Sequence, residues 1–263
     1  MTKGALFSLL LAIIIIASSM VGCGANATAT KGNGEPITVA AAADLQFAFG
    51  EIGELFHHET GRKVVFSFGS TGTLAKQIEN GAPMDVFAAA NVEFVDGLRG
   101  KGLVIAETQQ LYGIGRIVLA CNKKSGLVLR DIRELVRPEV RWVALANPEH
   151  APYGRAAQQA LEAAGVWDEV RPKLVFGENV SQAMQFVQTG NADAGIIALS
   201  VANVPDVDYV LIDQSLHQPL EQSMTVVAST KQGQASREFI AFVNGPNGRP
   251  IMKKYGFVLP GEF

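Results

Sequence analysis

Short apolar runs alternate with longer amphipathic segments along most of this chain, and this alternation limits the possible folds more than any other feature of the sequence. The apolar runs predict strands at 37–42, 63–68, 86–89, 117–122, 142–146, 173–176, 194–198, 207–211 and 224–228. The amphipathic segments predict helices at 45–60, 73–80, 92–101, 132–136, 154–164, 180–189 and 236–242. Strands that alternate with helices favour an α/β architecture with mostly parallel sheets. With 263 residues, the chain is long enough for two lobes.

The first residues have the pattern of a secretory signal. Lys3 is followed by an apolar run at 5–16 and then by small residues, and the run is shorter than the ~20 residues that a membrane-spanning helix needs. The four residues that end in Cys23 (MVGC) resemble a bacterial lipobox, which implies that Cys23 is lipidated and becomes the new N-terminus. Cleavage by an ordinary signal peptidase is the alternative. We therefore interpret residues 1–22 as a lipoprotein signal peptide.

The next segment, residues 23–35, is small, polar and glycine-rich, which is typical of a flexible tether. A lipid and a tether would hold the folded part outside the cytoplasmic membrane, in the periplasm or on the outer face, with the lipid as the membrane contact. The net charge of −3 argues against nucleic acid as a partner. Cys121 lies inside an apolar run, so we expect a buried core thiol rather than a reactive one.

Four predicted strand-to-helix junctions are rich in small residues and hydroxyl groups, and they lie at 41–44, 68–73, 148–154 and 176–180. A helix N-terminus presents unpaired N–H groups and a positive dipole end, so it suits an oxyanion. In open α/β sheets, ligands bind at the carboxyl ends of the strands, where these junctions fall. The alternative is that the polar residues at the junctions only cap helices, as such residues do routinely: Asp44, Ser70, Thr71 and Asn179.

The same junctions carry motifs that resemble those of the molybdate-binding proteins of ABC importers. The motifs are ITVAAAADL from Ile37, GSTGTLAKQI from Gly69, GAPMDVF from Gly81, APYGRAA from Ala151 and GENV from Gly177. Each motif alone is weak, but the ordered set is specific to that family, and the resemblance extends from about Ile37 to the C-terminus. It implies a two-lobed periplasmic-binding-protein fold of type II, with the anion in the cleft between the lobes.

Under this resemblance, lobe 1 would comprise residues 36–115 plus 222–263, and lobe 2 would comprise residues 116–221. The chain would cross between the lobes near 112–116 and 219–223. Closure about these crossings would bury the anion, and the closed form would dock on a membrane permease.

The ligand contacts of the family are carried over residue by residue. Asp44 falls where the family has a ligand-contacting Ser or Asn, Thr71 falls on the second hydroxyl contact, and Ser70 lies beside it. Tyr153 and Val180 fall on positions that donate backbone N–H groups from the other lobe. The resemblance thus implies a site of neutral donors for molybdate, and also for tungstate. The site would reach the metal only through the oxygens of the anion, with no direct metal coordination and no cofactor.

Two positions depart from the pattern of the family. Some members have a tyrosine hydroxyl where this chain has Ala198, so that donor is missing. An ionised Asp44 offers no donor, and its charge would repel a dianion. One interpretation is that the Asp44 side chain caps the helix and faces away, so that only its N–H reaches the ligand. The other is that Asp44 accepts a proton carried by the ligand, which would favour hydrogen phosphate.

Motifs for other chemistry are incomplete. The segment HETGR has Arg62 where a zinc-protease motif needs its second histidine. The histidines have no spacing that is typical of a metal site: His57, His58, His150 and His217. We therefore expect a monomeric binding protein that is not an enzyme and that delivers its anion to an ABC permease. The alternatives are a binding protein for phosphate or sulfate and, more remotely, a secreted hydrolase with Asp44 as its base.

Overall fold

The computed structural model describes residues 34–262. The predicted signal peptide, the lipidation residue Cys23 and the tether up to residue 33 lie outside the described residues. Within the described range, no helix combines the length and the apolar character that a membrane span requires.

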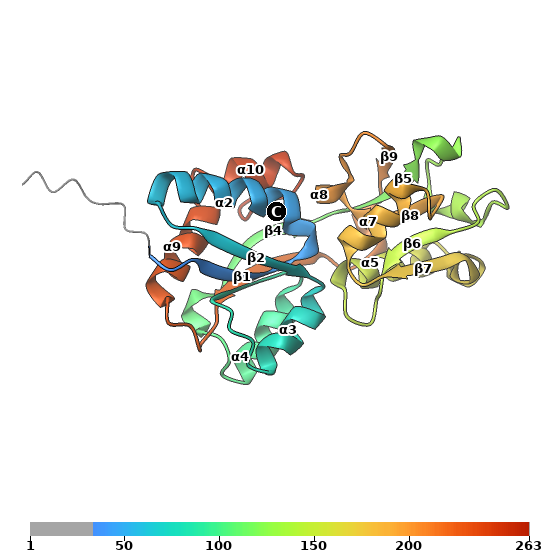
Figure 1. The fold of residues 1–263 in the computed structure, drawn as a ribbon. Helices are drawn as coiled ribbons and strands as arrows, with labels where there is room; N and C mark the ends of the chain where they lie inside the picture. Colours follow the sequence, from blue (N-terminus) through green and yellow to red (C-terminus); the bar gives the residue numbers. More distant parts are fainter. Residues whose placement is uncertain (1–33, 263) are drawn as a thin grey trace, which may run out of the picture. The chain divides into compact units, whose positions relative to one another are not determined.

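The first of two five-stranded sheets has the strand order β2-β1-β3-β10-β4. β1 pairs in parallel with β2 and β3, whereas β10 runs antiparallel to β3 and to β4. Helices α2, α9 and α10 pack together on one side of this sheet, and α3 and α4 lie on the other side (Figure 1). The strands of this sheet are β1 (Ile37–Ala42), β2 (Val64–Gly69), β3 (Val86–Ala89), β4 (Gln110–Gly115) and β10 (Leu220–Val226). Its helices are α2 (Gln46–Thr60), α3 (Thr71–Glu79), α4 (Val92–Gly100), α9 (Gly233–Val243) and α10 (Gly248–Lys254).

The second sheet has the order β7-β6-β8-β5-β9, and it repeats the pattern of the first. β6 pairs in parallel with β7 and β8, and β5 runs antiparallel to β8 and β9. Its strands are β5 (Ile117–Asn122), β6 (Val143–Ala146), β7 (Leu174–Gly177), β8 (Ala194–Ala198) and β9 (Val207–Leu211). Its helices are α5 (Pro152–Ala163), α6 (Trp167–Val170), α7 (Val180–Thr189) and α8 (Leu199–Ala202). Short 3-10 helices are η1 (Ala43–Leu45), η2 (Ala106–Thr108), η3 (Lys123–Ser125), η4 (Ile132–Val136), η5 (Arg171–Lys173) and η6 (Gln214–Leu216).

The two-lobed α/β fold with mostly parallel sheets that the sequence predicted is confirmed. Each sheet is mixed in one respect, because a single strand, β10 in the first and β5 in the second, runs antiparallel to its neighbours. The antiparallel pairings arise where the chain changes sheet, because β4 runs straight on into β5 through Arg116 and the returning strand β10 lies against β4. The return passes through residues 212–219. The lobe limits given above stay a prediction.

Each sheet is held by a buried apolar core. In the first, an aromatic cluster joins α2, β2 and α9, with the rings of Phe49 and Phe239 meeting edge to face at 5.8 Å between centroids. Phe66 of β2 packs on the same two rings. In the second, every residue of β5 is buried, including Cys121, as expected. Burial raises the pKa of the Cys121 thiol to about 11, so the thiol stays protonated and is a poor nucleophile at neutral pH.

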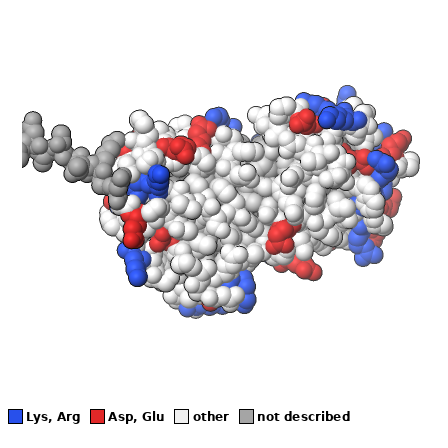
Figure 2. Space-filling model, viewed as in Figure 1, with Lys and Arg blue, Asp and Glu red and all other residues white. Residues whose placement is uncertain are grey.

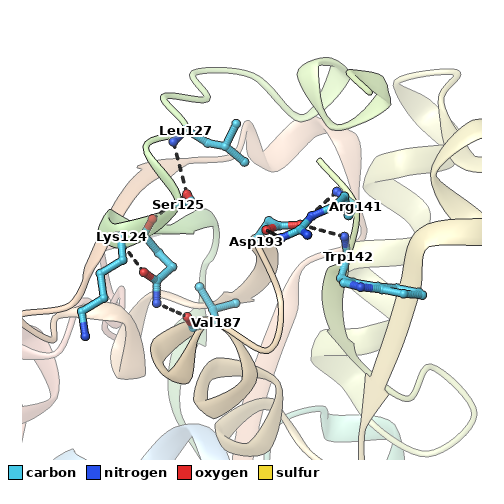
Figure 3. Close-up of polar contacts among 8 residues, drawn as sticks. Lys124, Ser125, Leu127, Arg141, Trp142, Val187 and Asp193 are labelled. Atoms are coloured by element: carbon cyan, nitrogen blue, oxygen red, sulfur yellow. Dashed lines mark hydrogen bonds and ion pairs between the residues drawn. The ribbon is translucent and has the colours of Figure 1, made fainter. Parts of the chain in front are cut away.

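Polar side chains stabilise one end of the second sheet, where β6 and β8 begin and β5 ends (Figure 3). The buried carboxylate of Asp193 accepts hydrogen bonds from the backbone N–H groups of Arg141 and Trp142, at 2.9 and 3.1 Å. The guanidinium of Arg141 forms an ion pair with its other oxygen at 3.2 Å. On β5, the side chain of Asn122 donates to the carbonyl of Val187 at the end of α7. These contacts lie far from the strand ends that meet at the site described next.

Candidate oxyanion-binding site

All five residues predicted to contact the ligand line one small cavity. It has an empty volume of about 200 Å³, part of it open to solvent. The residues come from both sheets, because η1 and α3 follow strands of the first sheet and α5 and α7 follow strands of the second. The lining residues are Ala42, Ala43, Asp44, Gly69, Ser70, Thr71, Ala90, Ala151, Pro152, Tyr153, Asn179 and Val180.

Three α-helices begin at this cavity. Their first residues are Thr71 of α3, Pro152 of α5 and Val180 of α7. The N–H groups of a first helical turn have no acceptor within their own helix, and the dipole places a partial positive charge there. The N–H groups of Thr71, Tyr153 and Val180 can therefore donate hydrogen bonds to an oxyanion. Together with the helix dipoles, they can stabilise its negative charge without a positively charged side chain.

Thr71 is the clearest hydroxyl donor. Its side chain is buried, and its Oγ1 accepts a hydrogen bond from the N–H of Ala90 at 3.1 Å. Because a hydroxyl can accept and donate at once, this contact fixes the oxygen and leaves the hydroxyl hydrogen for a ligand.

Ser70 is already engaged. It is the N-cap of α3, its hydroxyl donates to Oγ1 of Thr73 at 2.9 Å, and it lies 2.8 Å from Nδ1 of His150. The side chain of Asn179 likewise caps α7, where it accepts from the N–H of Gln182. Capping thus explains Ser70 and Asn179, and Ser70 would have to share its hydroxyl in order to contact an anion.

The expectation that the Asp44 side chain caps a helix is wrong. Its carboxylate caps no helix in the described chain, and the residue is completely buried. Oδ2 accepts hydrogen bonds from the Tyr153 hydroxyl at 3.0 Å and from Nε2 of Gln222 at 2.9 Å. Oδ1 has no hydrogen-bond partner among the described residues. Burial raises the pKa of Asp44 to about 6, and the hydrogen bonds from Gln222 and Tyr153 offset only part of that rise.

Two parts of this arrangement were not predicted from the sequence. Tyr153 was assigned only a backbone contact, yet its side chain reaches Asp44 from the other sheet, and Gln222 was not assigned at all. Nε2 of Gln222 also approaches the Tyr153 hydroxyl at 2.9 Å, so the three side chains form a closed triangle. Gln222 is buried in β10, but this strand also contains Glu221, Ser223 and Thr225, so the sequence carried no signal that singled out Gln222.

Further bonds connect the two sheets around the cavity. The hydroxyl of Ser181 donates to the carbonyl of Ala43 at 2.9 Å, and that of Ser200 donates to the carbonyl of Asp44 at 2.7 Å. The N–H of Gly72 donates to the carbonyl of His150, and a side chain at Gly72 would collide with that oxygen at 2.7 Å. The lobes are therefore closed on each other, with the helix N-termini inside.

The electrostatics of the site depend on neutral donors. No Lys or Arg stands among the described residues that line the cavity, and Asp44 is the ionisable carboxyl among them. Figure 2 shows that the charged side chains on the face in view gather mainly toward its ends, while much of the middle is uncharged. A larger cavity adjoins the small one and shares Ala43 and Asn179 with it.

These features agree with the comparison to known proteins. The family model described as bacterial extracellular solute-binding protein matches residues 37–258. The chain belongs to this family. As members of a solute-binding family, such chains act outside the cytoplasm.

Among the relatives of this solute-binding protein, the molybdate-binding protein ModA of Azotobacter vinelandii is 32% identical over 265 residues, with 96% of this chain and 99% of the relative covered. The protein of the same name from Escherichia coli is 33% identical, with 89% and 92% covered. The solved periplasmic molybdate-binding protein of Azotobacter vinelandii superimposes with a TM-score of 0.81 at 30% identity, covering 85% of this chain and 99% of that one. The likeness therefore spans both lobes and the cleft.

Proposed function

We propose that this protein captures molybdate outside the cytoplasmic membrane and delivers it to an ABC import permease, and that it also takes tungstate. The observation that carries the proposal is the convergence of three helix N-termini and the Thr71 hydroxyl on one small cavity, whose described lining residues include no positively charged side chain. Fixed neutral donors select an anion by its size and protonation, whereas a lysine would attract any anion. The molybdate-binding relatives support the choice of ligand.

The finer points belong to the same proposal. Asp44, Thr71, Tyr153 and Val180 would contact the oxygens of the anion, with Ser70 as a shared donor. The protein would work as a monomer without a cofactor and without enzymatic turnover. Lipidated Cys23 would be its link to the membrane.

The test is a titration of paired variants with molybdate. Val180→Pro removes one N–H, and proline is well tolerated at the first position of a helix, as Pro152 shows at the start of α5. Val180→Ala is its control, because it keeps the N–H. Thr71→Ala removes the hydroxyl, and Thr71→Ser keeps it. We expect Val180→Pro and Thr71→Ala each to weaken molybdate binding about tenfold or more, which corresponds to one lost hydrogen bond to a charged group. Unchanged affinity in both would reject this site.

One observation favours a second candidate ligand. The buried Asp44 has an unpaired oxygen, and hydrogen phosphate carries a proton that such an oxygen could accept. Parallel titrations with phosphate and sulfate decide between these anions, because phosphate binding with weak molybdate binding would reverse the assignment.

A further inference from the structure

Asp44 places an ionisable carboxyl at a site that is proposed to bind a dianion, which is unfavourable if the carboxyl is charged. It is completely buried in the wall of the cavity, and the cavity has no positively charged side chain among its described lining residues. An ionised carboxylate there would repel the ligand across a short distance in a medium that screens charge poorly. It would also offer the ligand no hydrogen, since a carboxylate only accepts.

The hydrogen bonds of Asp44 suggest how the problem is solved. Both side-chain donors, the Tyr153 hydroxyl and Nε2 of Gln222, point at the same oxygen, Oδ2, and the backbone N–H of Asp44 itself also acts on the carboxyl and lowers its pKa slightly. Oδ1 is buried and has no partner among the described residues. This asymmetry fits a neutral carboxylic acid, in which Oδ2 is the carbonyl oxygen that accepts two hydrogen bonds and Oδ1 carries the proton. A neutral acid donates to an anion, as an asparagine or a serine would.

We propose that Asp44 binds a proton when the oxyanion enters and donates it from Oδ1 in a hydrogen bond to an oxygen of the anion. This inference rests on the proposed function. Binding of fully deprotonated molybdate would then take up one proton from the solvent. The ionised Asp44 carboxylate, one proton and the molybdate dianion form a complex in which the carboxyl is neutral and the ligand is still the dianion. No covalent bond in the ligand changes. Asp44 would thus be a specificity-determining residue.

The other titratable groups around Asp44 keep their protons. Tyr153 of α5 and Tyr112 of β4 both face it, and burial together with the Asp44 charge holds their pKa values well above the usual range. Gln222 of β10 and Ser200 of α8 also hydrogen-bond to Asp44, and neither of them titrates. His150 is another side chain near the cavity that could exchange a proton when the anion binds. Its Nδ1 lies against the Ser70 hydroxyl, and its Nε2 is 3.6 Å from Oε2 of Glu178. A test must separate His150 from Asp44.

The direction of the pH effect follows from linkage. Without anion, burial already raises the pKa of Asp44 to about 6, and a bound dianion raises it further because it disfavours a second negative charge. Between these two pKa values the complex holds a proton that the free protein lacks, so molybdate affinity falls as the pH rises. The limiting slope is about tenfold per pH unit for one proton.

Hydrogen phosphate provides an internal contrast. It brings its own proton, so it can donate to an ionised Asp44 and bind with no proton uptake. Molybdate should therefore lose affinity relative to phosphate as the pH rises.

The experiment is calorimetry of the purified full chain with sodium molybdate at about pH 7.5, in buffers with different ionisation enthalpies, which gives the number of protons taken up. We expect close to one proton per molybdate for the wild type, and His150→Gln should leave this number unchanged. Asp44→Asn should bind molybdate with almost no proton uptake, because the amide accepts from Tyr153 and Gln222 through its oxygen and donates to the anion through its nitrogen. Asp44→Ser is the second variant, should the first fail to fold.

The outcomes separate the two proposals. Absence of molybdate binding to the wild type overturns the proposed function. Tight binding with less than about half a proton taken up overturns the role of Asp44 and leaves the function intact. Uptake that persists in Asp44→Asn or Asp44→Ser also overturns it, whereas uptake that is lost in these variants and kept in His150→Gln supports it.

Discussion

Two buried aspartates in this molecule, Asp193 and Asp44, have pKa values shifted in opposite directions. At the end of the second sheet, burial would raise the pKa of Asp193, but the Arg141 side chain and the N–H groups of Trp142 and Arg141 outweigh burial and lower it (Figure 3). In the cleft, Asp44 receives hydrogen bonds on one oxygen from two neutral donors, and its pKa rises to about 6.

The two aspartates differ in how many of their carboxylate oxygens accept hydrogen bonds. A carboxylate that only supports the fold has both oxygens occupied by donors, as Asp193 has. Asp44 keeps one oxygen without a partner in the described chain, beside a cavity in which three helices begin. A buried carboxyl oxygen without a hydrogen-bond partner lowers the stability of the fold. Unsatisfied groups and shifted pKa values of this kind are found most often at functional sites.

The largest expected effect is on protein stability, measured without added anion, when Asp44 is replaced. A folded-state pKa raised from 3.8 to about 6 means that the stabilising form is the protonated one, fully present below pH 3.8 and lost as the pH rises through about 6. Asp44→Asn removes this loss, so we expect it to be more stable than the wild type at pH 8 by up to about 3 kcal/mol. Denaturant melts at pH 4 and pH 8 measure the difference, which should shrink at the lower pH. Equal stabilities at pH 8 would contradict a charged Asp44 buried in the free protein.

Replacing Asp193 by Asn should change the stability of the protein in the opposite direction. Its lowered pKa means that the ionised form stabilises the fold above the unfolded pKa, and that this contribution is lost as the pH falls through the folded pKa. We expect Asp193→Asn to lose about 2 kcal/mol at neutral pH, because the ion pair and one charged hydrogen bond are lost. The same denaturant melts measure it, with molybdate affinity unchanged as the control. A stabilised Asp193→Asn would remove the contrast between the two aspartates.

A smaller effect is expected for Tyr153→Phe. The substitution keeps the ring and the backbone N–H, but it removes a hydrogen bond that forms between the two lobes. We expect molybdate affinity to fall about tenfold, a cost typical of one hydrogen bond to a charged or polar partner in a buried site. Gln158→Leu, at a half-buried position of the same helix whose side chain bonds to Glu162 at the surface, is the matched control. Full affinity in Tyr153→Phe would mean that closure does not depend on the triangle of Asp44, Tyr153 and Gln222.

The smallest effect is expected for Cys121→Ala. The thiol is buried in β5 with a pKa raised to about 11, and it serves only as core volume. We expect a loss of stability of about 1 kcal/mol and no change in molybdate affinity. Loss of affinity on this substitution, or its rapid alkylation in the native protein, would show that the thiol does more than fill space.

The sequence predicted most of the fold because its local signals are strong. Helix α7 begins and ends where predicted, since Asn179 caps its start and Gly190 takes the left-handed conformation at its end. Strand β4 was missed because Gln110–Gly115 contains two glycines and little apolar pattern, and it becomes a strand through pairing with β10. Helix α10 was missed because of Pro250, which the first turn of a helix tolerates.

The site was predicted in part for the same reason. Helix N-termini leave a local signature, so Thr71 and Val180 could be placed at the cavity from their motifs. The triangle around Asp44 could not be predicted, because Tyr153 and Gln222 lie 109 and 178 residues from Asp44 along the chain and Tyr153 reaches it from the other sheet. Local patterning carries no information on which buried polar groups find one another across a cleft.

The most direct test of the central claim is one calorimetric titration of the purified protein with molybdate at neutral pH, with phosphate and sulfate as parallel titrants. We expect tight binding of molybdate at a single site, and weak or absent binding of the two other anions. Tight phosphate binding, with molybdate weak or absent, would contradict it.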